Sequence, residues 1–429
     1  MKNFFIALIV VLLLLLAGAY WFLRQTQSYL HSDSFIHQLE GYMSEVMAVP
    51  VEIEDIELVD LSSATMVGFK IPLYQATAAA PDSAAAAPAA TPVLVDARRS
   101  TVVFAGIPKM EGDNTMKRLE INEPVVWLEQ EEDGAIAWPL FQSRFDSPAE
   151  LPGIELQEVV IKDAKVHITG RDGFTALVME GVDITGAFTA RQGFLTGGGE
   201  LTAERVLLGG KVAITNFKSP VEMSREVMKL TQMSGELYGG TLTGQMTVTP
   251  KPKSQPMELS FNAKRVDSGA FLEAMGIGSA LQIGQVEIDF QGWGELLEPL
   301  LIAGEADFFT SSFNSAGVPV IAQMQKTAQN LNLADVDFES LRGSLETNRG
   351  VVTFTRIESL PPDASRLTAQ GTVNLEGDLN LEGTIELEGG AVGSVEKFFK
   401  DAGLMSEDGS LVKQRFKVTG TTDEPKIEM

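Results

Sequence analysis

Apolar and polar residues alternate along most of the chain from residue 93 onward. Side chains of a strand point to opposite faces in turn, so a period of two predicts strands with one apolar and one polar face. The runs end at Gly, Asp or Pro, which is typical of turns between antiparallel strands. Clear examples are RLEINEPVVWLEQ, ELQEVVIKDAKVHITG, RVLLGGKVAITNF, GTLTGQMTVTP, MELSFNAKRV and QVEIDFQGWG. We count on the order of twenty such segments and predict a mostly β fold, an elongated antiparallel sheet.

A local repeat, NLEG, NLEG and ELEG, lies near the carboxy-terminal end of the sequence. Its leucines, Leu375, Leu381 and Leu387, are spaced six residues apart. An even spacing returns each leucine to the same face of a strand. The glycines that follow them predict a hairpin whose turn is at Glu376 and Gly377.

A few short helices are predicted to cap the sheet. The segment SFIHQLEGYMSEVMA has apolar residues at helical spacing, with Asp33 or Ser34 as its N-cap. Those apolar residues are Phe35, Ile36, Leu39, Tyr42, Met43, Val46 and Met47. Residues 51–73 alternate well enough for two strands. Three later amphipathic segments predict helices: DSGAFLEAMG with Asp267 as N-cap, residues 318–331, and residues 392–403.

The amino-terminal segment decides the predicted compartment. Residues 4–23, FFIALIVVLLLLLAGAYWFL, carry no charge. At about 1.5 Å per residue this run spans a hydrocarbon core of about 30 Å, and Tyr20 and Trp21 fall at its outer interface. Lys2 and the α-amino group precede the run, and Arg24 follows it. The sequence therefore predicts a single-pass anchor in the inner (plasma) membrane of a Gram-negative-type cell, with the amino terminus cytoplasmic and the bulk of the chain periplasmic.

A cleaved signal peptide is the alternative, because Ala17-Gly18-Ala19 has the small-residue pattern that a signal peptidase accepts. The apolar run is longer than a usual signal-peptide core and continues beyond that point through YWFL. Its length favours the anchor.

The segments above divide the chain into five parts. Residues 75–92 form an Ala/Pro-rich tract with almost no charge, which predicts a flexible insert between strands. The predicted parts are a cytoplasmic tip and membrane anchor (1–24), an amphipathic helix with the first strands (25–74), the insert (75–92), an amino-terminal β region (93–230) and a carboxy-terminal β region (231–429).

Composition argues against several functional classes. A net charge of -25 disfavours nucleic-acid partners and electrostatic docking on anionic lipid, so any membrane contact should be hydrophobic. The absence of cysteine excludes disulfides and Cys-ligated zinc. The histidines are His31, His37 and His167, and the sequence has no G-x-S-x-G, H-E-x-x-H or Walker motif. We therefore expect no catalytic residue, no cofactor and no metal site.

Five segments, taken in order, resemble the AsmA-like family of bacterial envelope proteins. They are MKRLEINEPVVWLEQEEDGAIAWPLF; LPGIELQEVVIKDAKVHITG, which is similar to a hairpin of that family; SGELYGGTLTGQMTV; SLRGSLETNRGVVTFTRIESLPPDASRLTAQGTVNLEGDLNLEGTIEL; and the closing VTGTTDEPKIEM. The Ala/Pro insert and a length below that of the large bridge-like members depart from the pattern. The resemblance implies a curved, groove-like sheet that takes part in phospholipid transport between membranes and in outer-membrane biogenesis and homeostasis.

The strand pattern suggests which side chains would line such a groove. The candidates, which alternation puts on one face, are Leu259, Phe261, Val286, Ile288, Phe290, Leu375, Leu379, Leu381 and Leu387. Two alternatives stay open. The same apolar face could form the core of a closed β-sandwich. The protein could instead be a scaffold that engages outer-membrane or other envelope proteins during their assembly or targeting.

Overall fold

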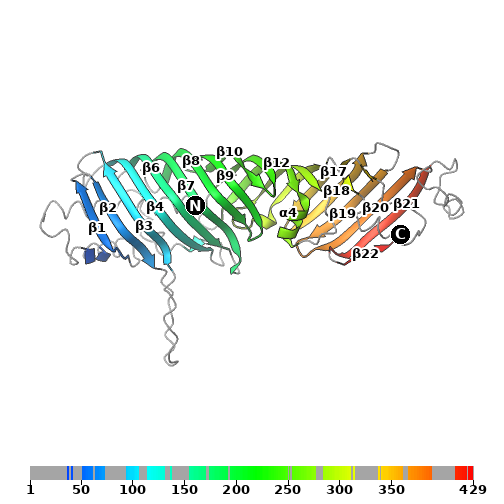
Figure 1. The fold of residues 1–429 in the computed structure, drawn as a ribbon, viewed down its shortest axis with the longest axis horizontal. Helices are drawn as coiled ribbons and strands as arrows, with labels where there is room; N and C mark the ends of the chain where they lie inside the picture. The colour runs from blue at the N-terminus through cyan, green and yellow to red at the C-terminus, as the bar shows by residue number, and fades with distance from the viewer. Residues whose placement is uncertain are drawn as a thin grey trace, which may run out of the picture. The chain divides into compact units, whose positions relative to one another are not determined.

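The fold is mostly β, as the alternation predicts (Figure 1). The computed structural model describes residues 36–37, 40–41, 51–60, 63–72, 93–105, 114–130, 136–137, 154–170, 173–191, 194–249, 251, 254–276, 284–310, 313–314, 337–338, 340–360, 366–388, 411–422 and 424–428. The predicted membrane anchor, the Ala/Pro insert and the predicted helices at 318–331 and 392–403 lie outside these residues. Within the described residues, no helix is long and apolar enough to cross a bilayer.

The chain forms two compact units. Unit 1 consists of residues 1–210, 215–233 and 247–256, and unit 2 of residues 211–214, 234–246 and 257–429. The strands of unit 1 are β1 (Asp55–Asp60), β2 (Ser63–Pro72), β3 (Val93–Phe104), β4 (Asn114–Gln130), β5 (Ile136–Ala137), β6 (Ile154–Thr169), β7 (Thr175–Arg191) and β8 (Phe194–Leu208). Four strands have residues in both units: β9 (Val212–Met223), β10 (Met228–Leu237), β11 (Gly240–Val248) and β12 (Pro256–Asp267), of which β12 has only Pro256 in unit 1.

Unit 2 carries the carboxy-terminal half of the strands. Its elements are β12 (Pro256–Asp267), α4 (Ser268–Met275), β13 (Gln285–Glu295), the 3-10 helix η3 (Pro299–Leu301), β14 (Ala303–Thr310), β15 (Phe313–Asn314), β16 (Asp337–Phe338), β17 (Ser340–Asn348), β18 (Val351–Leu360), β19 (Arg366–Asn374), β20 (Asp378–Glu388), β21 (Leu411–Thr421) and β22 (Pro425–Glu428). β13, β14 and β17–β22 pair antiparallel, each with the next strand in this order.

The prediction of an antiparallel sheet is wrong for one pair in unit 1. β4 pairs parallel with β6, while β1–β4 and β6–β8 pair antiparallel with their neighbours in the chain. Parallel strands need a connection that brings the chain back to the same end of the sheet. The residues between Gln130 and Ile154 provide that connection, and they include β5, which pairs antiparallel with the end of β4.

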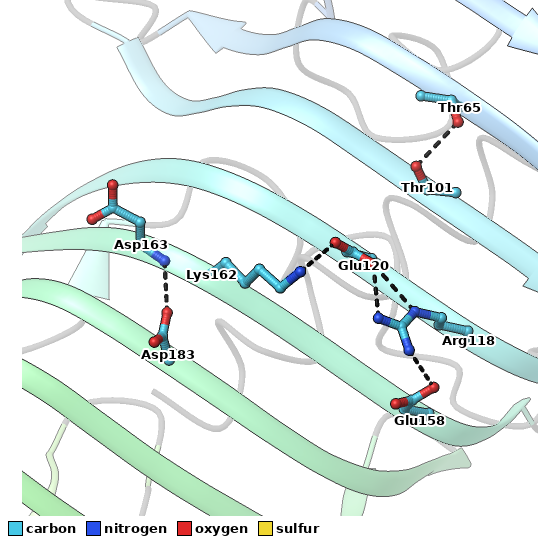
Figure 2. Close-up of polar contacts among 8 residues, drawn as sticks. All are labelled: Thr65, Thr101, Arg118, Glu120, Glu158, Lys162, Asp163 and Asp183. Atoms are coloured by element: carbon cyan, nitrogen blue, oxygen red, sulfur yellow. Dashed lines mark hydrogen bonds and ion pairs between the residues drawn. The ribbon is translucent and has the colours of Figure 1, made fainter.

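A line of β-bulges crosses unit 1. Gly68 in β2, Glu123 in β4, Asp163 in β6 and Gly181 in β7 all have φ between 50° and 65°, and the pairing registers skip them. The Asp163 amide donates a hydrogen bond to the Asp183 carboxylate at 2.8 Å across the β6–β7 gap (Figure 2). A bulge adds one residue and bends its strand. In the β6–β7 pair the register also shifts on either side of Ala164, next to Asp163.

The bulge in β6 explains a wrong prediction. The segment LPGIELQEVVIKDAKVHITG resembles a hairpin, but residues 154–169 form one strand. Lys162 and Asp163 are both exposed in the middle of it, whereas Ile161 and Ala164 are both buried although they are three residues apart. The extra residue therefore keeps the apolar side chains on one face without ending the strand.

The predicted helix after Asp267 is confirmed. Asp267 caps α4, because its side chain accepts hydrogen bonds from the amides of Gly269 at 2.8 Å and Ala270 at 3.1 Å. Gly276 ends the helix in the left-handed conformation. Of the helix predicted near residue 40, the described residues Ile36, His37, Glu40 and Gly41 are helical, and Glu40 accepts a hydrogen bond from the Ile53 amide at 2.8 Å.

The predicted hairpin at Glu376 and Gly377 is also confirmed. β19 ends at Asn374, whose side chain accepts hydrogen bonds from the amides of Glu376 at 3.1 Å and Asp378 at 2.8 Å. Gly377 has φ 86°, a value that favours glycine. Leu375 consequently lies in the turn and not in a strand, so its spacing from Leu381 does not place it on the same sheet face.

Glycines on the apolar side of unit 2 allow a test of the packing. A Cβ at Gly383 in β20 would meet the Thr368 carbonyl oxygen and the ring of Phe416. We expect Gly383→Val to lower the free energy of unfolding by about 1–3 kcal/mol, because an inserted side chain forces its neighbours to move. Thr384→Val, one residue along on the opposite face, is the control and should change stability by less than about 0.5 kcal/mol. Equal effects in urea unfolding would contradict the packing described.

Candidate functional site: an apolar sheet face and its charged reverse

In unit 2 the pairing register lines up apolar side chains across seven strands, β13, β14 and β17–β21. One central row is Ile288, Phe308, Gly343, Ile357, Ala369, Gly383 and Phe416. The next row is Phe290, Ala306, Leu345, Phe354, Gly371, Leu381 and Val418. We call these two rows the apolar face. Neither row contains a charged residue.

Phenylalanine rings lie over glycines on this face. A Cβ built on Gly304 would be 2.7 Å from Cζ of Phe290, and one on Gly343 would be 2.5 Å from Cζ of Phe308. The ring of Phe416 occupies the same kind of position over Gly383. A side chain at any of these glycines would push the ring away from the sheet. The glycines therefore let the rings lie close to the backbone, so that the rings project little from the sheet.

The predicted groove residues are mostly brought together. Val286, Ile288 and Phe290 share one face of β13, and the Phe290 ring stacks on Phe261 of β12 with ring centroids 5.1 Å apart. Leu259 lies two residues before Phe261 in the same strand. In β20, Leu379, Leu381 and Leu387 are separated by even numbers of residues, and they pair with Gly420, Val418 and Val412 of β21.

The face contains both buried and partly exposed side chains. Val286, Phe290 and Leu379 are buried. Leu259, Phe261, Ile288 and Leu381 are partly exposed. Sequence reasoning missed the partly exposed Leu345, Phe354 and Ile357, and the buried Phe308. Apolar material that contacts this face would therefore meet side chains that the sheet itself does not cover.

The reverse face of the same strands is polar. Cross-strand pairs such as Asp289 with Asp307, Glu305 with Glu346 and Arg366 with Glu386 lie on it. Lys413 forms an ion pair with Glu386 at 2.6 Å. Like charges opposite one another destabilise a sheet unless opposite charges lie near them. The arrangement of cations on this face therefore matters for the fold.

Unit 1 has an ion-pair network with equal numbers of positive and negative side chains. Arg118 binds Glu120 at 2.9 Å and Glu158 at 2.7 Å, and Lys162 binds Glu120 at 2.8 Å, so that the side chains join β4 to β6 (Figure 2). Hydrogen bonds from Lys162 and Arg118 hold the pKa of the Glu120 carboxyl below its ordinary value. Hydrogen bonds to Glu120 and Glu158 raise the pKa of Arg118. The formal charges of the four groups cancel.

Unit 2 has a network whose charges do not cancel. Glu358 on β18 is contacted by Arg342 of β17 at 3.2 Å, by Arg356 of its own strand, and by Arg366 of β19 at 2.5 Å. The Glu358 side chain is only 7% exposed, whereas the three arginine side chains are 50–61% exposed. The hydrogen bond from Arg366, followed by that from Arg342, lowers the pKa of the Glu358 carboxyl, although burial opposes this. One carboxylate thus faces three guanidinium groups.

Metal-binding clusters are a separate matter. Among the described residues, no group of three or more His, Asp or Glu side chains is placed to hold a metal ion. His167 on β6 stacks against Trp127 on β4, with ring centroids 5.8 Å apart. His37 contacts Glu40 at 2.9 Å. His31 lies outside the described residues.

Comparison of the chain with protein-family models, with characterised proteins and with solved structures gives no match. The candidate functional features of the described residues are the two faces of the sheet in unit 2. The first is an apolar face with partly exposed side chains, and the second is a charged reverse face with a surplus of arginine around Glu358.

The Glu358 network predicts a pH dependence of stability. Because the folded-state pKa of Glu358 lies below its unfolded value, its ionised form stabilises the fold above the unfolded pKa of about 4.3, and this contribution is lost as the pH falls through the lowered folded pKa. We expect Glu358→Gln to lower Tm at pH 7, and we expect the Tm difference from wild type to shrink as the pH falls from about 5 towards 3. Thermal unfolding followed by circular dichroism measures this.

Glu376→Gln is the control, because Glu376 is exposed in the β19–β20 turn and contacts the hairpin through its backbone amide. This variant should match wild type in Tm at every pH. A Tm loss in Glu358→Gln that stays constant down to pH 3 would show that the carboxylate charge is not what stabilises the network.

Proposed function

We propose that this protein binds phospholipid acyl chains on the apolar face of unit 2. We further propose that it is an AsmA-like protein, anchored in the inner membrane through residues 4–23, which moves phospholipids between membranes and supports outer-membrane biogenesis. The supporting observation is the uninterrupted apolar face across seven strands, with Ile288, Leu345, Phe354 and Leu381 partly exposed on it.

The dimensions of the face suit an acyl chain. Seven strands at about 4.8 Å per strand give a path of about 29 Å across the sheet. The hydrocarbon core of a bilayer is about 30 Å thick and holds two acyl chains end to end, so one chain takes about half that length. The path therefore accommodates a whole chain lying across the strands.

The energetics also suit such a ligand. Each methylene removed from water contributes about 0.8 kcal/mol. A carboxylate or ammonium group on the path would require desolvation and would oppose this gain, and neither central row contains one. Because glycines lie beneath Phe290, Phe308 and Phe416, these rings lie close to the backbone of the sheet.

The proposal makes a prediction about lipid binding. Ile288→Asn and Leu381→Asn each put an amide at a partly exposed position of the apolar face, which makes contact with an acyl chain unfavourable. Phospholipid that copurifies with the full-length chain should fall by about threefold or more in each variant, since loss of about 0.7 kcal/mol corresponds to that factor. Native mass spectrometry and phosphorus analysis of the extracted lipid measure it.

Thr419→Asn is the matched control. Thr419 lies on the reverse face of β21, is also partly exposed, and pairs with Asn380. Lipid content should be unchanged in this variant. The proposal fails when wild type carries no phospholipid after purification in several mild detergents, or when all three variants lose lipid to the same extent.

A further inference from the structure

The Glu358 network has an excess of positive charge in a strongly acidic protein. The chain has a net charge of -25, yet Arg342, Arg356 and Arg366 together with Glu358 carry a formal charge of +2, from three cations and one anion. Three guanidinium groups around one carboxylate repel one another, and Glu358 can compensate only one of them. An anion from outside would relieve the remaining repulsion.

The carboxylates next to the three arginines on the adjacent strands make contacts with other side chains. Glu386 lies opposite Arg366 on β20, but its carboxylate is paired with Lys413 at 2.6 Å. Arg356 lies opposite Ser344 on β17, whose hydroxyl donates a hydrogen bond to Asp307 at 2.6 Å. Arg342 lies opposite Phe309 on β14, which has no charge.

The arginines retain donors that point to solvent. A guanidinium has five N–H groups, and each of these three uses one terminal nitrogen to contact Glu358. Half or more of each arginine side chain is exposed, whereas the Glu358 carboxylate beneath them is almost completely covered. Three guanidinium groups from neighbouring strands, each with N–H groups that do not contact Glu358, thus meet at this carboxylate. Groups of this kind match the oxygens of a phosphate group, which accept two parallel hydrogen bonds from one arginine.

The cluster lies near one end of its strands. Arg366 is the first residue of β19, Arg342 is the third residue of β17, and β18 ends two residues beyond Glu358 at Leu360. The three arginines therefore lie at the same end of three neighbouring strands. The balanced network of Arg118, Lys162, Glu120 and Glu158 in unit 1 has no such surplus.

We propose that Arg342, Arg356 and Arg366, which all contact Glu358, form a binding site for a phosphate group on the reverse face of unit 2. The phosphate can come from an anionic phospholipid headgroup or from the free ion, and the chemistry of recognition is the same. The site does not depend on acyl-chain binding on the apolar face, so either proposal can fail without the other.

Inorganic phosphate is the first probe, added to the full-length chain at constant ionic strength with sodium chloride as the compensating salt. Phosphate should raise the Tm of wild type by about 2 to 4 °C. The rise should be larger in Glu358→Gln, because the ion then replaces the missing carboxylate. It should be lost or at most half as large in Arg356→Gln, which removes the most exposed of the three cations.

Arg118→Gln is the matched control, because it removes an arginine from the balanced network of unit 1 and should keep the wild-type response to phosphate. Circular dichroism checks the fold of each variant, and Arg342→Gln replaces Arg356→Gln in the test should the latter not fold. An equal phosphate response in wild type, Arg356→Gln and Arg118→Gln would overturn the proposal, as would the lack of any response in wild type and Glu358→Gln.

Short-chain lipids below their micelle concentration identify the source of the phosphate. Displacement of phosphate by dihexanoylphosphatidylglycerol, but not by dihexanoylphosphatidylcholine, supports the site and assigns it to anionic headgroups. Phosphate binding that neither lipid displaces supports the site and assigns it to the free ion. Equal displacement of phosphate by both lipids in wild type would show that an anionic headgroup is not what is recognised and would overturn the headgroup assignment.

Discussion

The fold depends on a single constraint, which is that each strand must present its apolar side chains to the same face as its neighbours. A shift of the pairing register by one residue would send a whole set of side chains to the other face. In unit 2 that shift would move Phe308 and Phe290 to the charged side and bring Asp307 and Asp289 among the leucines. Burying two unpaired carboxylates costs far more than the hydrophobic gain of a few pairs. The difference between the apolar face and the charged face therefore determines the pairing register of the strands.

Bulges make this constraint compatible with strands of up to 17 residues. In β6 the bulge at Asp163 absorbs one residue, and in β18 a register shift between Phe354 and Ile357 does the same. Both residues that flank the β18 shift remain on the apolar face, although an uninterrupted strand would put them on opposite faces. Bulges also bend strands. Bulges thus keep the apolar face constant along these long strands.

Much of this could be predicted from the sequence, because alternation is a local signal. The strands, the Asp267 cap of α4 and the turn at Gly377 all depend on residues within a few positions of one another. The bulges were harder to predict, because Glu123 and Asp163 adopt positive φ without being glycine, and a polar pair in the middle of a strand looks like a turn. Phe308 was not predicted because Phe309 follows it directly and hides the alternation, although the two side chains lie on opposite faces. The parallel β4–β6 pair and the arginines around Glu358 depend on contacts between distant residues that no local pattern reveals.

The position of Glu358 shows how the two faces are linked energetically. Its neighbours on β18, Ile357 and Ser359, lie on the other face, where Ser359 accepts a hydrogen bond from the Leu367 amide at 2.7 Å. This bond joins β18 to β19 at the level where Arg366 reaches Glu358 from the reverse side. A change in charge around Glu358 therefore acts on the same pair of strands that carries Ile357, Phe354 and Gly371 on the apolar face. The sheet is a single backbone layer, so the strands that carry the arginines on one face also carry the apolar side chains on the other. An anion held by the arginines would therefore stabilise the pairing of these strands. It would thereby help to hold the apolar side chains in the register on which their common face depends.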